Sequence, residues 1–309
     1  MTGETRLVMG VDGGGTQSTA IVARWAEDEE IECLARGTGG PSNPHVVGWE
    51  TAQTNLLRAV RDACRAARVE EIDAVCFSVA GCGRPEEQAT LMRWLETERV
   101  ADTHIVVDDG RAILRAGTPD GVGVGVIAGT GSLVVGRNAH SESARAGGWG
   151  YLLGDEGSGY AIGLEGLKAI TKAADGVGPK TELSDALLST CMFKEPAELI
   201  QWVYGETCGR RDVAWLAPVV LAAAKRKDEV ALSIVWRQLH MLERKVRAVV
   251  SRLGFTEDDE YHIALAGGVM AGDELYRSRL LAELRIPDNR ATVVQHPEIG
   301  AALLAAELS

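Results

Sequence analysis

Several features that mark other protein classes are missing from this sequence of 309 residues. No apolar run approaches the 18 or more residues of a membrane-spanning helix. The first 30 residues carry Asp12 and an acidic run at 27–30, and they contain no apolar stretch of signal-peptide length. We therefore expect no membrane partner and a cytoplasmic location.

Cysteine is present but never in the C-x-x-C spacing of zinc knuckles and thioredoxin-type sites. A cytoplasmic location would keep the thiols reduced, so we expect buried structural thiols. The sequence has six: Cys33, Cys64, Cys76, Cys82, Cys191 and Cys208.

Positive charge is scarce relative to negative charge. The 32 lysines and arginines against 44 aspartates and glutamates leave a formal net charge of −12. Such a surface repels a phosphate backbone, which argues against nucleic acid as a partner. ATP is still compatible with it if backbone N–H groups and a metal ion meet the phosphates locally, and the 36 glycines direct attention to glycine-rich turns.

The helical phosphate loop G-x-x-x-x-G-K-[ST] is also absent, and a different glycine turn is present. Asp12-Gly13-Gly14-Gly15-Thr16 lies between predicted strands at 6–12 and 18–24. Glycines without Cβ atoms let backbone N–H groups approach an anion, Asp12 suits Mg²⁺, and the Thr16 hydroxyl suits a phosphate oxygen. The alternative is a flexible hairpin turn capped by an aspartate. A strand follows the glycines, which excludes a dinucleotide fingerprint.

Two further glycine turns follow along the chain. Gly129-Thr130-Gly131-Ser132 joins predicted strands at 122–128 and 133–136, with the same construction as the first turn. Gly267-Gly268 ends a predicted strand at 261–266, where small residues leave room for a flat ring. Two unrelated hairpins and an ordinary strand-to-helix turn are the alternatives.

Hydrophobic periodicity predicts the remaining elements. The first part reads β-β-β-α-β-α-β-α, with a third strand at 31–36, a helix at 49–69, a strand at 72–79, a helix from Pro85, a strand at 104–108 and a helix at 111–116. The second part continues after its hairpin with helices at 157–174, 181–192, 195–205, 211–226 and 228–253, a helix from Asp273, a strand at 291–295, and a last helix from Pro297 or Glu298.

In this order the three turns resemble the phosphate-1, phosphate-2 and adenosine motifs of the actin/hexokinase/heat-shock-protein ATPase superfamily. Gly-Val-Asp-Gly-Gly-Gly-Thr at 10–16, Gly-Thr-Gly-Ser at 129–132 and Gly-Gly-Trp-Gly-Tyr-Leu-Leu-Gly-Asp-Glu-Gly-Ser at 147–158 look like the N-acetylglucosamine kinase branch of the BadF/BadG/BcrA/BcrD family. The resemblance implies an α/β fold of two actin-like (ribonuclease H-like) lobes. Each would have a mixed sheet flanked by helices, with the nucleotide in the cleft between them. The lobes would be residues 1–117 completed by 297–309, and residues 118–296 with a helical insertion.

The same resemblance implies transfer of the γ-phosphate of Mg-ATP to the 6-hydroxyl of N-acetylglucosamine. Asp109 matches the catalytic aspartate, which would accept the proton of the attacking hydroxyl. Adjacent strand residues face opposite sides, so its neighbour Asp108 competes for the role, and the spacing to the following Thr-Pro-Asp-Gly favours Asp109. A solvated strand end or a helix N-cap is the alternative for this pair.

Family positions for nucleotide and sugar carry over as well. The nucleotide positions, with Asp12 as the metal ligand, are Asp12, Gly13, Gly14, Gly15, Thr16, Gly129, Thr130, Gly131, Gly267 and Gly268. The substrate positions are Asn43, Asp109, Ser132, Gly148, Trp149, Gly150, Asp155 and Glu156. Asn43 could also be a turn residue and Trp149 a core residue. The segment at 210–215 does not align to an adenine contact.

Three alternatives remain open. The sugar could be glucosamine or N-acetylmuramic acid. The protein could be an ATPase activator without a sugar substrate, although no cysteine lies near Gly129 or residues 147–158 to hold the iron–sulfur cluster of such activators. A non-catalytic sensor would not need Asp12, Asp109 and Asp155 together. The resemblance also implies a homodimer.

Overall fold

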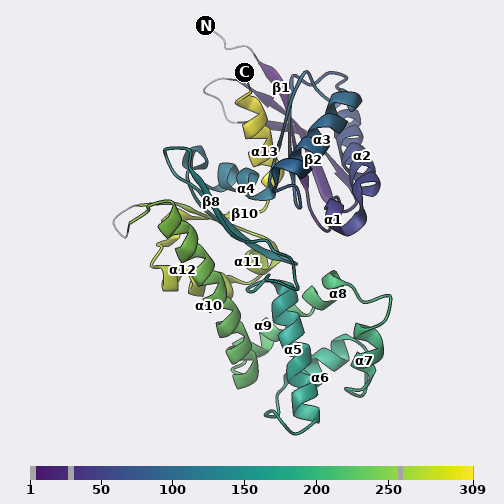
Figure 1. The fold of residues 1–309 in the computed structure, drawn as a ribbon, viewed down its shortest axis with the longest axis vertical. Coiled ribbons are helices and arrows are strands. Elements are labelled where there is room, and N and C mark those ends of the chain that lie inside the picture. Colours follow the sequence, from purple (N-terminus) through teal and green to yellow (C-terminus); the bar gives the residue numbers. More distant parts are fainter. Residues whose placement is uncertain (1–4, 27–30, 257–259, 309) are drawn as a thin grey trace. The chain divides into compact units, whose positions relative to one another are not determined.

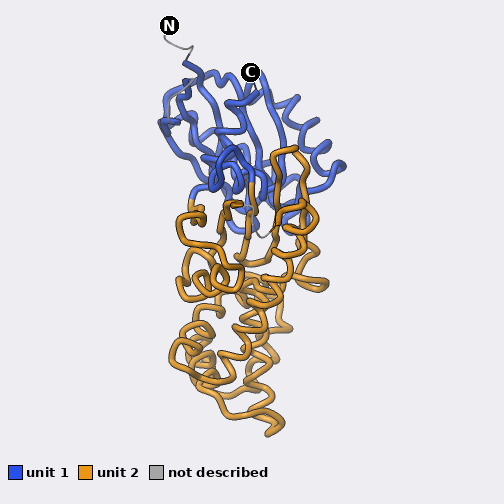
Figure 2. The backbone as a smooth tube through the Cα atoms, turned by 90° about the vertical axis from the view of Figure 1, so that its left-hand side faces the viewer, with its two compact units in different colours: residues 1–122, 296–309 blue, residues 123–295 orange. Residues whose placement is uncertain are grey.

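The computed structural model describes residues 5–26, 31–256 and 260–308. The predicted acidic turn at 27–30 lies outside these residues. The chain divides into two compact units, Met1–Val122 with His296–Ser309 (unit 1) and Gly123–Gln295 (unit 2), coloured separately in Figure 2.

Unit 1 is built on a five-stranded mixed sheet in the order β3-β2-β1-β4-β5. The first three strands are antiparallel, while β4 and β5 run parallel to β1. All five predicted strands are confirmed, as β1 (Arg6–Gly13), β2 (Ser18–Trp25), β3 (Glu32–Gly39), β4 (Ala74–Val79) and β5 (Thr103–Val107).

Helices cover both faces of this sheet because its central strands alternate between two apolar layers. Met9 and Val11 pack with α2 and α3, whereas Val8 packs with α4 and α13 (Figure 1). The last helix of the chain thereby completes the first unit. The helices of unit 1 are α1 (Pro44–Val47), which was not predicted, α2 (Trp49–Ala67), α3 (Pro85–Glu98), α4 (Asp109–Gly117), η1 (Pro119–Gly121) and α13 (Pro297–Ala306).

Unit 2 has its own five-stranded mixed sheet, in the order β10-β9-β6-β7-β8. Its third hairpin strand, β8, was not predicted because its sequence is polar and small and its residues are exposed or half-buried. The strands are β6 (Gly123–Ala128), β7 (Ser132–Arg137), β8 (Ser143–Gly147), β9 (Ile263–Ala266) and β10 (Ala291–Val294).

Most of unit 2 outside its sheet is helical, and one apolar core joins the sheet to these helices. The helix predicted at 211–226 is wrong as a single element: Pro218 has no N–H to continue a helix, and two helices, α8 and α9, meet near it. The helices are α5 (Gly159–Ala174), α6 (Leu183–Thr190), α7 (Glu198–Val203), α8 (Arg210–Ala214), α9 (Ala217–Lys225), α10 (Glu229–Arg252), α11 (Gly268–Gly272), α12 (Glu274–Leu284) and η2 (Asp288–Arg290).

Two whole-chain expectations can be compared with the structure. Within the described residues, no helix combines the length and the apolarity needed to cross a membrane. The expectation of buried thiols is wrong for Cys33, which is exposed on β3, while the other five cysteines are buried or half-buried.

Candidate active site

The first glycine turn has a defined shape at the end of β1. The Gly14 N–H donates to the Gln17 carbonyl at 3.0 Å, and the Gly13 carbonyl accepts from the Ala80 N–H at 2.7 Å. Gly15 and Thr16 are exposed, and open space surrounds the position that a Cβ on Gly15 would take. The backbone at Gly15 and Thr16 is therefore exposed, while hydrogen bonds at Gly13 and Gly14 fix the shape of the turn.

Two buried serines attach this turn to the loop that precedes α1. Ser18 Oγ donates to the Gly40 carbonyl and lies 2.8 Å from Ser42 Oγ, and the Ser42 N–H donates to the Gly14 carbonyl at 2.9 Å. A polar cavity of about 340 Å³ adjoins the turn and the loop, lined by Thr16, Gln17, Thr38, Gly39, Gly40 and Arg58. The turn and the loop thus form one structural unit.

Asn43 lies at the end of that loop and caps α1. Its Oδ1 accepts from the His45 N–H at 3.0 Å, which is the turn role that composition alone suggests. Gly81, which follows β4, packs so closely that a Cβ there would lie 2.5 Å from Asn43 Oδ1. The cap uses only the carbonyl end of the amide, so the Nδ2 end is not engaged in it.

Three carboxylates influence one another at the end of β1. The pKa of Asp12 is raised to about 7, chiefly by burial and in addition by the neighbouring charges of Asp109 and Glu298. Glu298 is 3% exposed and is paired with Arg36 at 2.7 Å. The sequence analysis did not select Glu298, because its only local signal is a place in the first turn of a helix.

The structure separates the roles of Asp108 and Asp109. Asp108 is the N-cap of α4, and its Oδ1 accepts from the Gly110 N–H at 3.0 Å and the Arg111 N–H at 3.2 Å. Asp109 is the first residue of the helix, and its charge acts on Asp12 and on the buried thiol of Cys82. Asp109 is therefore the member of the pair that shares an electrostatic environment with the glycine turn.

A magnesium ion fits this arrangement when it arrives with a nucleotide. Among the described residues, no group of three or more His, Cys, Asp or Glu side chains could hold a metal ion by itself. Mg²⁺ commonly takes one or two carboxylates and completes its shell with water and phosphate oxygens. The mutual repulsion that raises the pKa of Asp12 is what a cation would relieve.

In unit 2 the second and third glycine turns lie against each other. The Gly129 N–H donates to the Gly131 carbonyl at 2.9 Å, and the Gly129 carbonyl accepts from the Gly159 N–H at 2.8 Å. Gly267 has φ +91°, and a Cβ there would lie 2.5 Å from the Ala128 carbonyl. Gly268 begins α11, a short helix that was not predicted. Only glycine at 267 allows this approach.

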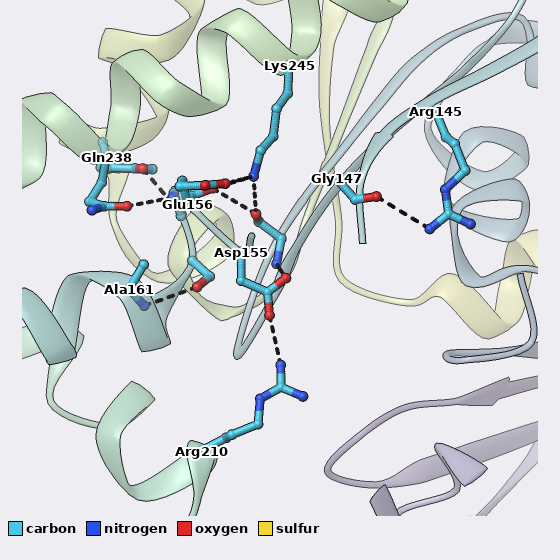
Figure 3. Close-up of polar contacts among 12 residues, drawn as sticks. Arg145, Gly147, Asp155, Glu156, Ala161, Arg210, Gln238 and Lys245 are labelled. Atoms are coloured by element: carbon cyan, nitrogen blue, oxygen red, sulfur yellow. Dashed lines mark hydrogen bonds and ion pairs between the residues drawn. The ribbon is translucent and has the colours of Figure 1, made fainter. Parts of the chain in front are cut away.

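Asp155 and Glu156 lie in a network of polar contacts beside the second turn (Figure 3). Asp155 is 3% exposed; its Oδ1 accepts from the Ser132 N–H at 3.2 Å and its Oδ2 from Arg210 at 2.8 Å. The carboxylate of Glu156 pairs with Lys245 at 2.8 Å. Partial burial alone would raise the pKa of Glu156, but the hydrogen bond from Lys245, a backbone hydrogen bond and the charge of Lys245 together outweigh it and lower the pKa. Sequence reasoning assigned no role to Arg210 or Lys245.

The glycines around Trp149 take backbone conformations that suit glycine. Gly148 and Gly150 have φ +70° and +82°. Trp149 itself is 65% exposed, so its interpretation as a core tryptophan is wrong. The exposed indole is available for contact with a ligand.

Comparison with known proteins identifies the family. Residues 9–305 match the BadF/BadG/BcrA/BcrD ATPase family. The chain belongs to this family. The predicted family is therefore confirmed over nearly the whole chain.

Two relatives of this BadF/BadG/BcrA/BcrD family member are named as sugar kinases. The N-acetyl-D-glucosamine kinase of Dictyostelium discoideum is 30% identical, with 97% of each chain covered. The N-acetylmuramic acid/N-acetylglucosamine kinase of Clostridium acetobutylicum is 32% identical, with 86% of each chain covered. Both similarities extend through unit 1 and unit 2.

A solved structure supports the predicted fold class. A protein from Chromobacterium violaceum, assigned as an N-acetylglucosamine kinase, matches with a TM-score of 0.73 and 25% identity, covering 97% of this chain and 99% of that one. The two mixed sheets flanked by helices confirm the α/β, actin-like prediction.

Proposed function

We propose that this member of an ATPase family transfers the γ-phosphate of Mg-ATP to the 6-hydroxyl of N-acetylglucosamine. The main support is the similarity to two sugar kinases at 30% and 32% identity over most of the chain. The electrostatic influence of Asp109 on Asp12 supports it as well, because phosphoryl transfer to an alcohol uses a carboxylate near the bound phosphates.

In this proposal the glycine turns bind Mg-ATP. The exposed backbone of Gly14, Gly15 and Thr16 contacts phosphate, and the turn around Gly129, Thr130 and Gly131 contacts phosphate from unit 2. Gly267 and Gly268 lie against that turn and leave flat backbone for the adenosine. Asp12 would hold Mg²⁺, which would withdraw charge from the phosphate oxygens.

The chemistry asked of the protein is positioning and proton transfer. Asp109 orients the 6-hydroxyl and accepts its proton as the oxygen attacks the γ-phosphorus. Asp108 cannot take this role in the observed conformation, since its carboxylate caps α4.

The sugar is bound by residues that the resemblance assigns to it. Asn43 offers the amide end that its cap does not use, and residues 148–150 offer exposed backbone beside the indole of Trp149. Ser132, Asp155 and Glu156 already hold one another and two cations, so we propose that they define the shape of this region as well as contact sugar hydroxyls.

N-acetylmuramic acid is the second candidate acceptor. It is favoured by one observation, the name of the Clostridium acetobutylicum relative, which includes both sugars. Both share the acetamido group and the 6-hydroxyl, and they differ at the lactyl ether on carbon three. The site assignments are the same for either sugar.

An assay of ADP release with Mg-ATP and a panel of sugars tests the proposal. The panel contains N-acetylglucosamine, N-acetylmuramic acid, glucosamine and a blank without sugar. We expect release to depend on an N-acetylated sugar and NMR of the product to show the phosphate on carbon six. Release at the same rate in the blank would favour an ATPase without a sugar substrate.

The homodimer and the cytoplasmic location are further parts of the proposal. They rest on the family resemblance and on the sequence composition. Size-exclusion chromatography with light scattering tests the first, and fractionation of cells tests the second.

A further inference from the structure

The second glycine turn has a buried negative charge directly against it. Asp155 Oδ1 accepts from the Ser132 N–H, and a Cβ on Gly131 would lie 2.9 Å from Asp155 Oδ2. A carboxylate at this distance repels a polyphosphate bound on the other side of the turn, because water does not screen a buried charge. Something must compensate the charge if the turn is to bind phosphate.

Arg210 supplies that compensation. Its guanidinium donates to Asp155 Oδ2 at 2.8 Å and lies over the ring of Tyr151, 4.9 Å from the ring centroid. Figure 3 shows Arg210 and Lys245 approaching the Asp155–Glu156 pair from opposite sides. Arg210 donates to the carboxylate of Asp155, whereas Lys245 pairs with the carboxylate of Glu156.

The local structure fixes where the guanidinium lies. Arg210 is the first residue of α8, and Asp212 Oδ2 accepts from the Gly209 N–H at 2.7 Å, which sets the start of the helix. Asp155 in turn has φ +65°, in the left-handed region, which aspartate adopts more readily than most non-glycine residues. The Arg210 Nε is buried without a hydrogen-bond partner, so the side chain is placed by stacking and by a single ion pair.

We infer that Arg210 is a positioning residue for the phosphate-binding turn of unit 2, acting through Asp155. It orients the carboxylate that holds the Ser132 N–H and cancels its charge where the nucleotide phosphates bind. This inference rests on the proposed function for the phosphate role of the turn. Arg210 is not among the site residues that the sequence predicted.

A double variant of Arg210 and Asp155 separates charge compensation from direct contact with phosphate. Arg210→Gln leaves the buried carboxylate uncompensated, so we expect the dissociation constant of Mg-ADP to rise about tenfold or more. Adding Asp155→Asn removes that charge while its amide oxygen still accepts from Ser132. The double variant should therefore bind within about threefold of the wild type, tighter than the single variant.

Isothermal titration calorimetry with Mg-ADP measures these constants for the intact protein. Arg210→Lys keeps the charge but loses the planar stack on Tyr151, so its dissociation constant should lie between those of the wild type and Arg210→Gln. Arg226→Gln is the matched control, because Arg226 also makes one ion pair in unit 2, with Glu182, and both side chains are exposed. It should leave binding unchanged.

Two results would overturn the inference. One is unchanged binding in Arg210→Gln; the other is a double variant as weak as the single one, which would mean that Arg210 contacts the phosphate itself. If Arg210→Gln does not fold by circular dichroism, the double variant and Arg210→Lys still decide. Wild-type binding of Mg-ADP without sugar phosphorylation would defeat the sugar kinase proposal alone, while absence of nucleotide binding would defeat both.

Discussion

At the scale of single residues, Asp108 and Asp109 show how one helix start divides two identical side chains. The N-cap residue has extended backbone, φ −71° and ψ 159°, and turns its carboxylate onto the first amides of α4. The next residue already belongs to the helix, so its side chain points elsewhere. Its charge adds to the effect of burial in raising the pKa of Asp12.

This division predicts opposite outcomes for two matched substitutions. Asp109→Asn should lower kcat by about a hundredfold or more, because the proton acceptor is lost, while Mg-ADP affinity changes by less than about threefold. Asp108→Asn should keep most activity, since asparagine caps a helix about as well as aspartate. Steady-state kinetics and calorimetry on both variants measure this. Near-normal turnover in Asp109→Asn would remove Asp109 from the mechanism.

The first and last of the three glycines in the first turn, Gly13 and Gly15, give a second residue-scale prediction. A Cβ at Gly15 meets open space, so Gly15→Ala should keep the thermal stability and weaken nucleotide binding, by occupying room that the phosphates need. A Cβ at Gly13 would lie 2.6 Å from Ser42 Oγ, so Gly13→Ala should lower stability as well. Thermal melts with and without Mg-ADP separate the two. Unchanged nucleotide binding in Gly15→Ala would argue against this turn as a phosphate site.

At the scale of elements, the start of α10 joins two helices of unit 2. Asp228 caps α10 by accepting from the Ala231 N–H at 2.8 Å, and it also accepts from Thr181 and from the Glu182 N–H, which precede α6. Partial burial alone would raise the pKa of Asp228, but these hydrogen bonds together outweigh it and lower the pKa. One carboxylate thus connects segments far apart in sequence.

Asp228→Ala should therefore destabilise the protein by about 1–2 kcal/mol at neutral pH, the usual effect of losing an N-cap. Because the folded-state pKa is lowered, the stabilisation by Asp228 is fully present above the pKa of an unfolded aspartate. It is lost as the pH falls through the folded-state value. Urea unfolding of wild type and variant across acidic pH should show the difference narrowing; a constant difference would contradict the assignment to the charged form.

At the scale of the whole molecule, the chain leaves unit 1 after Val122 and returns to it at His296. The returning helix α13 is fully buried along Ala301, Ala302 and Ala305. It packs so closely on α4 that a Cβ on Gly300 would lie 1.9 Å from the Ala112 carbonyl. Unit 1 therefore completes its core only with the last residues of the chain.

Gly300→Ala is expected to destabilise unit 1 by about 1–3 kcal/mol through overpacking. Hydrogen exchange should quicken in β1, β4 and α4 while the core of unit 2 keeps its protection. Gly272→Ala is the control, since a Cβ there meets nothing within 4 Å. Equal loss of protection in both units would mean that the two unfold together.

The sequence alone predicted many of the turns, strands and helices of this protein, because these elements depend on residues close together in the chain. The glycine turn after β1 and the periodic helix α2 follow from neighbouring residues, and so does the order of strands and helices in unit 1. The motif at 147–158 contributed to the prediction of the family. Where local signals were weak the prediction was incomplete, as for the polar strand β8 and the interrupted helix α8–α9.

Tertiary structure decided which charged groups meet. Glu298 acts on Asp12, and Arg210 pairs with Asp155 across 55 positions of sequence. These partners lie on elements brought together by packing, and no residue spacing encodes that distance. Asp108 and Asp109 are separated by a local feature instead: the family pattern favoured Asp109, and the start of α4 shows that the carboxylate of Asp108 caps the helix.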